Sequence, residues 1–219
     1  MRQKDDLGLH FNVRITAREN GKLIRSSTRE SHNVFVNGGR AWVTQILGSS
    51  DYGQTPPTAH IRSKIKYIGF GCGGALQSDN QFANTRTEIV SVDALEDAIP
   101  YSVTGGVSTF LKAVANQAQD TISFPDSYRA RFIVTVLESE ISYVGSTTRI
   151  SLREPGLSVP VSECGLYLSS AAPTFTTGGG GLGSEADPSS ANGLVAYNTF
   201  EPIPVTPNTV LRAIWELRQ

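Results

Sequence analysis

The hydrophobic and polar positions near the C-terminus alternate with a period of two residues. Between residues 210 and 218, one set of alternating positions holds Leu211, Ala213, Trp215 and Leu217, and the other set is mostly polar. This period is typical of a β-strand with one buried face and one face in water. A second apolar run, residues 194–200, lies before it, and a proline-rich connector, residues 201–208, separates the two runs. Because proline is excluded from central strands, this connector marks the end of one strand and the start of the next. The pattern predicts two strands that meet at a corner and close a β-sandwich, with Trp215 buried in its core.

A second alternating segment near the N-terminus predicts a β-hairpin. Residues 9–19 alternate, Asn20-Gly21 is a strong hairpin turn signal, and the return run 22–28 carries few core residues. Because exposed strand edges invite pairing with other chains, we expect residues 1–30 to form an arm that packs on a neighbouring subunit. The apolar residues of this arm are the expected assembly contacts: Phe11, Val13, Ile15, Leu23 and Ile24.

One short helix is expected between residues 39 and 47. Trp42, Ile46 and Leu47 are spaced so that they share one apolar helical face. Asn37 is suited to cap the start of this helix and Gly48 to end it. We therefore expect Trp42 to be buried.

The remaining periodic segments predict further strands. They are residues 65–74, 86–92, 103–118, 120–123, 128–141, 145–154 and 157–170. The segment 128–141 is apolar on both faces, which fits a strand in the middle of a sheet. The sequence thus predicts an all-β fold, an antiparallel, jelly-roll-like β-sandwich. We expect one domain, residues 31–219, interrupted by a flexible Gly/Ser-rich loop at 171–193.

Composition and charge narrow the function classes. The chain has 219 residues, with 19 Lys+Arg against 20 Asp+Glu and a formal net charge of −1. Its densest basic stretch is Arg62-Ser63-Lys64-Ile65-Lys66, so we expect no nucleic acid partner. No apolar run approaches the roughly 18 residues that span a membrane, and residues 1–11 lack the apolar region of a signal peptide. We expect a chain that folds in a cytoplasm with no membrane partner. Cys72 and Cys164 are expected to be buried free thiols, with a disulfide between them as the alternative.

No residue pattern indicates catalysis, a cofactor or a metal. His10, His32 and His60 are not in metal-ligand spacing, and no G-x-S-x-G motif occurs. Gly69, Gly71 and Gly74 satisfy G-x-G-x-x-G, with Glu88 or Asp93 at the distance of the usual acidic partner. No helical pattern follows the glycines, however, so they indicate a strand end with close backbone packing. The pairs Glu138/Glu140 and Glu96/Asp97 lack the aromatic groove of a glycosidase. We therefore expect a protein that is not an enzyme and has no small-molecule substrate.

Glu163 is the most unusual charged residue because it lies inside an apolar strand, Val161-Ser162-Glu163-Cys164-Gly165-Leu166. A buried carboxylate needs a charged or hydrogen-bonding partner. Arg86, Arg40 and Arg129 are the candidate partners for a buried ion pair that specifies the fold.

Four segments occur in an order that resembles a family of tailed-bacteriophage virion proteins. They are HNVFVNGGRAWVTQIL (32–47), IKYIGFGCGG (65–74), SECGLYLSS (162–170) and LVAYNTFEPIPVTPNTVLRAIWELR (194–218), with Arg86-Thr87-Glu88 at the place of a further family element. The chain departs from the family pattern in Tyr197, where arginine is usual, and in long excursions at 139–160 and 171–193. The resemblance implies an oligomeric β-sandwich subunit on the tail, baseplate, collar or head of the particle, and we expect the collar/neck or tail–baseplate region. It also implies a location in the virion, and contacts with other virion proteins and with further copies of the chain.

Two other functions remain open from the sequence. The first is a head (capsid) decoration protein, which is also structural. The second is a carbohydrate-binding jelly roll, because β-sandwiches host lectins. That function requires exposed aromatic residues in a groove, and the candidates are Tyr52, Tyr101, Tyr128 and Tyr143.

Overall fold

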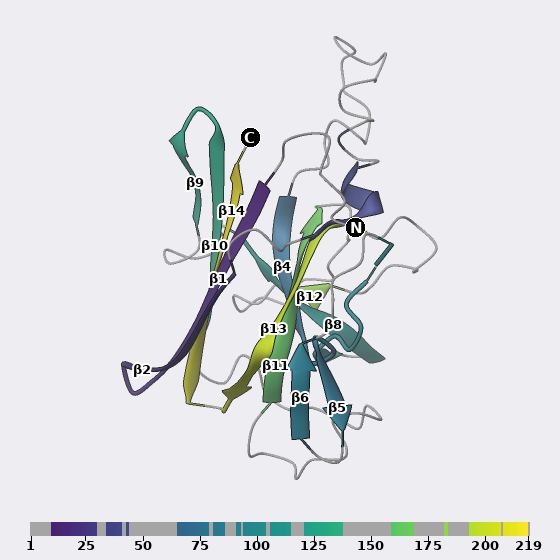
Figure 1. Ribbon diagram of the computed structural model, residues 1–219, viewed down its shortest axis with the longest axis vertical. Coiled ribbons are helices and arrows are strands. Elements are labelled where there is room, and N and C mark those ends of the chain that lie inside the picture. The colour runs from purple at the N-terminus through teal and green to yellow at the C-terminus, as the bar shows by residue number, and fades with distance from the viewer. Residues whose placement is uncertain are drawn as a thin grey trace.

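The computed structural model shows two antiparallel β-sheets packed face to face, together with a short helix that begins at residue 37 (Figure 1). It describes residues 10–29, 34–40, 43, 65–78, 81–85, 91–92, 94–103, 106–114, 121–137, 159–168, 182–183, 193–206 and 208–218. The expected all-β sandwich is confirmed.

The first sheet has five strands in the order β2-β1-β14-β10-β9. Its strands are β1 (His10–Glu19), β2 (Lys22–Arg29), β9 (Thr121–Asp126), β10 (Arg129–Val136) and β14 (Thr209–Arg218). The turn between β1 and β2 has positive φ at Asn20 (49°) and Gly21 (76°), as the sequence pair predicts for a tight hairpin.

The second sheet has seven strands, six of them in the order β12-β8-β4-β11-β13-β3, with β7 paired to β8. Its strands are β3 (Val34–Phe35), β4 (Ile65–Gly71), β7 (Pro100–Val103), β8 (Gly106–Ala113), β11 (Val159–Leu168), β12 (Leu182–Gly183) and β13 (Leu194–Val205). A separate hairpin consists of β5 (Ala75–Ser78) and β6 (Gln81–Thr85).

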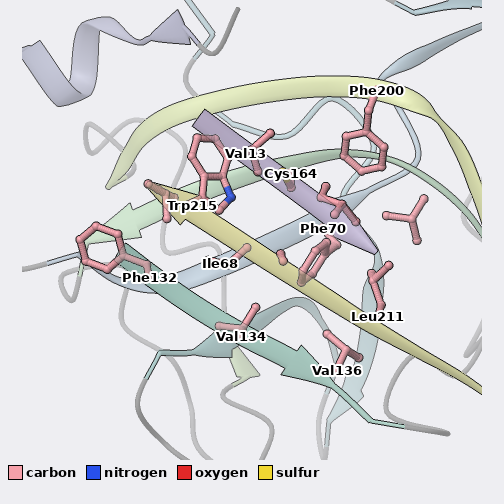
Figure 2. Packing of buried hydrophobic residues seen from close by; sticks show 14 of the residues in the cluster. Val13, Ile68, Phe70, Phe132, Val134, Val136, Cys164, Phe200, Leu211 and Trp215 are labelled. Carbon is pink, nitrogen blue, oxygen red and sulfur yellow. The ribbon is translucent and has the colours of Figure 1, made fainter. Parts of the chain in front are cut away.

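One hydrophobic core lies between the two sheets (Figure 2). Trp215 on β14 is fully buried there, between Val13 on β1 and Phe132 on β10, which are its register partners. From the opposite sheet, Ile68, Phe70, Cys164 and Phe200 belong to the same cluster. The predicted burial of Trp215 is confirmed. Both cysteines are buried and free.

The N-terminal hairpin is not a separate arm, which corrects the expectation from the sequence. β1 pairs with β14 along its whole length, from His10 opposite Arg218 to Glu19 opposite Thr209. Val13 and Ile15 are only 3% and 1% exposed, because they face the core of their own chain. The alternation of β1 predicted a buried face correctly, but it carries no information on whether that face is covered by the same chain or by a neighbour.

The two C-terminal strands also differ from the expected arrangement. β13 belongs to the seven-stranded sheet and β14 to the five-stranded sheet, so the chain crosses between the layers. The crossing lies at Thr206–Thr209, where the Thr209 amide donates to the Thr206 carbonyl (3.0 Å) and the Thr206 amide donates to Thr209 Oγ1 (2.9 Å). Pro202 and Pro204 lie inside β13, beyond the two residues that pair with β3. No described strand pairs with β13 next to these prolines on the β3 side, so their missing N–H groups lose no hydrogen bond there.

Smaller differences concern element boundaries. The helix begins at residue 37 rather than 39, so Asn37 is in its first turn, and the Arg40 amide donates to the Val36 carbonyl. Within the expected strand 103–118, the described residues form the end of β7 and all of β8, and the β5–β6 hairpin was not predicted. The expected strand 145–154 and most of the strand 86–92 and of the loop 171–193 lie outside the described residues.

Candidate interaction surfaces and a buried carboxylate

The Glu163 carboxylate lies at the centre of the seven-stranded sheet and is fully buried. Its Oε1 accepts hydrogen bonds from the backbone amides of Gly73 (3.0 Å) and Asp97 (2.8 Å). Its Oε2 accepts from the Glu96 amide (3.0 Å) and from the Tyr197 hydroxyl (2.7 Å). Four donors therefore compensate the loss of hydration of this carboxylate.

Glycines at the end of β4 and directly after it make room for this carboxylate and for the backbone of β11. A Cβ atom at Gly71 would lie 2.2 Å from Glu163 Oε1, and one at Gly73 would lie 2.9 Å from the same oxygen. A Cβ at Gly74 would lie 1.9 Å from the Ser162 carbonyl oxygen. The segment is followed by strand β5 and not by a helix. The glycines thus serve close packing at a strand end, as the sequence indicated.

Among the described residues, Glu163 is held by backbone amides and the Tyr197 hydroxyl, and not by the predicted arginines. Arg40 donates to the Phe35 carbonyl (3.2 Å), and Arg129 contacts Asp126 and Glu216. Arg86, like Trp42, lies outside the described residues. Backbone amides of residues 73, 96 and 97 take the place of the expected ion pair. Because every residue other than proline has a backbone amide, such donors cannot be predicted from a pattern of side chains in the sequence.

Strands from four distant stretches of the chain meet in the sheet that holds this carboxylate. β4, β11, β13 and β3 are successive neighbours there. Tyr197 on β13 supplies the side-chain donor to Glu163. The constellation ties residues 94–99 to the sheet, because the Cys72 amide also donates to Asp97 O (2.8 Å) and the Ile99 amide to Phe70 O (3.0 Å).

The exposed apolar residues gather at the two edges of the five-stranded sheet. Leu23 and Ile24 on edge strand β2 are 53% and 45% exposed. Val13 and Ile15 are in the core, and Phe11 lies on β1 opposite Leu217. Of the expected assembly contacts, Leu23 and Ile24 are therefore accessible to a neighbour, whereas Val13 and Ile15 are covered by their own chain.

The opposite edge carries a second apolar group, which the sequence did not predict as a contact. On edge strand β9, Ile122 is 40% and Phe124 75% exposed, and Tyr128 in the β9–β10 turn is 70% exposed. The sequence does contain an indication of this exposure. Phe124 directly precedes Pro125-Asp126, a pair typical of turns, and a residue next to a turn is less often buried than one inside a core strand. Among the described residues, Leu137 is the other large apolar side chain exposed to solvent.

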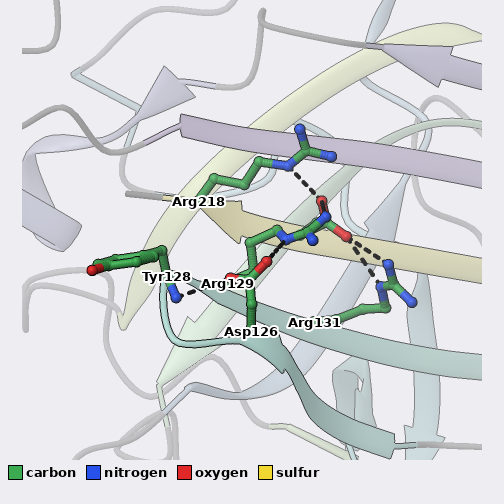
Figure 3. A network of polar contacts seen from close by, with 6 residues as sticks. Asp126, Tyr128, Arg129, Arg131 and Arg218 are labelled. Atoms are coloured by element: carbon green, nitrogen blue, oxygen red, sulfur yellow. Dashed lines mark hydrogen bonds and ion pairs between the residues drawn. The ribbon is translucent and has the colours of Figure 1, made fainter.

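A network of ion pairs covers the outer face of β10 and β14 (Figure 3). Glu216 Oε2 accepts from Arg131 Nε (3.1 Å) and Nη2 (2.8 Å), and its Oε1 accepts from Arg218 Nε (2.5 Å). Burial alone would raise the pKa of Glu216, but the hydrogen bonds and charges of these two arginines outweigh it and hold the pKa below its usual value.

Asp126 extends the network to the β9–β10 hairpin. The Tyr128 amide donates to Asp126 Oδ1 (2.9 Å) and Arg129 pairs with Oδ2. The amide hydrogen bond, followed by the Arg129 contact, lowers the pKa of Asp126. The network therefore fixes the shape of the hairpin that presents Phe124 and Tyr128.

The remaining candidate residues do not form a reactive site in the part of the chain that the structure describes. Glu138, Glu140, His32 and His60 lie outside it, and the backbone amides of Glu96 and Asp97 are donors to Glu163. Within the described residues, no group of three or more His, Cys, Asp or Glu is arranged to hold a metal ion. No helix among them has the length and apolar character needed to cross a membrane.

Of the tyrosines proposed for carbohydrate binding, Tyr128 is exposed on a turn. Tyr101 lies on β7, and Tyr52 and Tyr143 are outside the described residues. The β9–β10 turn thus presents one of these four aromatic side chains to solvent.

No protein-family model, curated protein or solved structure matches this chain.

Proposed function

We propose that this chain is a non-enzymatic structural subunit of a tailed-phage virion, in the collar/neck or tail–baseplate region, and that it acts through contacts with copies of itself and with other virion proteins. The gathering of exposed apolar side chains at both edges of one sheet carries this proposal. Exposed apolar groups that are concentrated in this way mark sites of protein association. The order of the four segments that resemble phage virion proteins supports the virion part of the proposal.

The β9–β10 hairpin is the proposed anchor for a second copy. Phe124 and Tyr128 are large aromatic side chains, the type that dominates binding energy in interfaces. Edge strand β2 presents Leu23 and Ile24 at the other end of the same sheet. Different patches at opposite edges favour head-to-tail contacts, which close into rings or extend into fibres.

The molar mass of the full chain in solution tests the self-association. We expect an oligomer by light scattering, and a shift to monomer in the double variant Phe124→Ser, Tyr128→Ser. Leu137→Ser is the matched control, because it removes an exposed apolar side chain directly after β10, at the end of that strand opposite to the β9–β10 turn. A wild-type monomer at all concentrations would refute self-association through these edges.

The location in the particle tests the virion assignment. We expect mass spectrometry to find the chain in purified particles of a phage that encodes it, and labelled antibody to bind at the collar or tail. Label on the capsid would instead favour the head decoration protein. Absence from the particles together with hits on a glycan array would favour the carbohydrate-binding alternative.

A further inference from the structure

The outer face of the five-stranded sheet carries six arginines and no lysine. Each of three adjacent strands contributes two of them: Arg14 and Arg18 on β1, Arg212 and Arg218 on β14, and Arg129 and Arg131 on β10. The inward positions of the same strands hold core residues such as Val13, Trp215 and Phe132, so the arginines share the opposite face.

The strand registers order these arginines into a continuous stripe. Arg218 lies opposite Arg129, and Arg131 lies opposite Glu216 in the next row of the same face. Further along, Arg14 lies opposite Ile214, and Arg212 opposite Thr16. The last row has Arg18 opposite Val210. With about 6.8 Å between rows on one face, the stripe is about 27 Å long.

The positive charge of this stripe exceeds the negative charge beside it. Glu216 and Asp126 pair with Arg131, Arg218 and Arg129 at one end of the stripe. At the other end, Arg14, Arg18 and Arg212 are exposed and make no ion pair with the described residues. The excess is local, because the whole chain has a net charge of −1.

The face combines this charge with apolar contact area. Ile214 and Val210 are partly exposed on β14 and lie on the same face as the arginines. Protein interfaces are enriched in arginine and depleted in lysine, and the guanidinium fork matches a carboxylate with two hydrogen bonds. A nucleic acid would meet the arginines with its phosphates, but it offers little to the apolar side chains between them, and the net negative charge of the chain opposes it.

We propose that this arginine face docks an acidic, carboxylate-bearing surface of another protein. The proposal rests on the proposed structural function, and it adds a second contact surface to the sheet edges and gives the chemistry of the partner. The free end of the stripe supplies most of the attraction, while Glu216 holds Arg131 and Arg218 in place for contact.

Poly-L-glutamate is the probe for this face, with double-stranded DNA in a parallel titration. We expect the full chain to bind poly-L-glutamate at low salt and to bind it more weakly as salt rises. The triple variant Arg14→Gln, Arg18→Gln, Arg212→Gln should bind about tenfold more weakly, since each exposed ion pair contributes little alone. The matched control Arg62→Gln, Lys64→Gln, Lys66→Gln removes the same charge from the densest basic stretch of the sequence and should bind within about twofold of wild type.

Four results would overturn the proposal. They are no binding by wild type at low salt, binding by the triple variant as tight as wild type, an equal loss in the triple variant and its control, and tighter binding to DNA that the triple variant loses. Should the triple variant fail to fold by circular dichroism, Arg14→Gln and Arg212→Gln are titrated singly. If the chain is found in particles but the triple variant binds as wild type does, only this inference fails. If the chain is absent from particles, the virion assignment fails, and the binding of poly-L-glutamate still tests whether the arginine face binds carboxylates.

Discussion

The hydrogen bonds to Glu163 span the sequence between residues 73 and 197, and they give this single residue a large effect on stability. Replacing Glu163 with Gln puts an amide group among four donors and leaves at least one of them without an acceptor. We expect a loss of about 1–3 kcal/mol in the free energy of unfolding, measured by urea denaturation. The exposed Glu201→Gln on β13 is the control and should change stability by less than about 0.5 kcal/mol. Equal denaturation midpoints for wild type and Glu163→Gln would contradict the structural role of the carboxylate.

Trp215 is the largest fully buried side chain among the described residues. Its side chain is fully buried between strands β1 and β10, so truncation to alanine removes apolar contacts and leaves a cavity. We expect Trp215→Ala to cost about 3–5 kcal/mol, measured as a shift of the denaturation midpoint. Ile214→Ala, on the outer face of the same strand, should cost less, and a smaller effect for Trp215 than for Ile214 would show that the face assignment is wrong.

At the scale of elements, the sequence predicts single strands better than it predicts their partners. The alternation of β14 and the two-faced apolar pattern of β10 survive in the structure, because burial of a strand face is a local property. The pairing of β1 with β14 and the crossing between sheets at residues 206–209 depend on contacts between distant segments, which local periodicity does not record. The same holds for Glu163. Its burial could be predicted from the apolar residues next to it in the sequence, but three of its four hydrogen-bond donors are backbone amides of distant residues, which could not.

The place of β1 inside the sheet changes what a truncation does. Deleting residues 1–29 removes Val13, Ile15 and Ala17 from the core and leaves β14 without one of its two neighbours. We expect the truncated chain to lose its cooperative thermal transition rather than to remain a folded domain that fails to assemble. A sharp transition near the wild-type temperature would restore the hypothesis of a separate arm.

The turn of the first hairpin offers a milder test of the same element. Gly21 has a φ of 76°, and a Cβ atom there would meet no heavy atom within 4 Å. The cost of Gly21→Ala is therefore conformational and should be about 1–2 kcal/mol in the free energy of unfolding. An unchanged stability would mean that the turn relaxes to a negative φ, and Lys22→Ala serves as the control for a change at an exposed neighbour.

At the scale of the whole molecule, the two sheets have different roles. The seven-stranded sheet holds the buried carboxylate, whereas the five-stranded sheet carries the exposed apolar edges and the arginine face. This division connects acid sensitivity to the five-stranded sheet through Glu216. Its pKa in the folded chain is below the ordinary value of 4.5, so its contribution to stability is present above about pH 4.5 and is lost as the pH falls through the folded pKa.

Unfolding measured between pH 7 and pH 3 checks this contribution. Glu216→Gln should be less stable than wild type at pH 7, and the difference should shrink as the pH falls below about 4.5, because the wild-type carboxyl is then protonated as well. A difference that stays constant over this range would assign the effect to packing rather than to charge.

The shared core predicts that the two sheets unfold together. Trp215 and Val134 from the five-stranded sheet contact the same cluster as Phe70 and Leu166 from the seven-stranded sheet, so neither layer keeps its apolar face covered without the other. Layers that share a core usually unfold together in a single transition. We therefore expect Val134→Ala and Glu163→Gln, which lie in different sheets, to shift the same transition as seen both by tryptophan fluorescence and by far-ultraviolet circular dichroism. Two separate transitions, each moved by only one of the variants, would show that the layers are independent units.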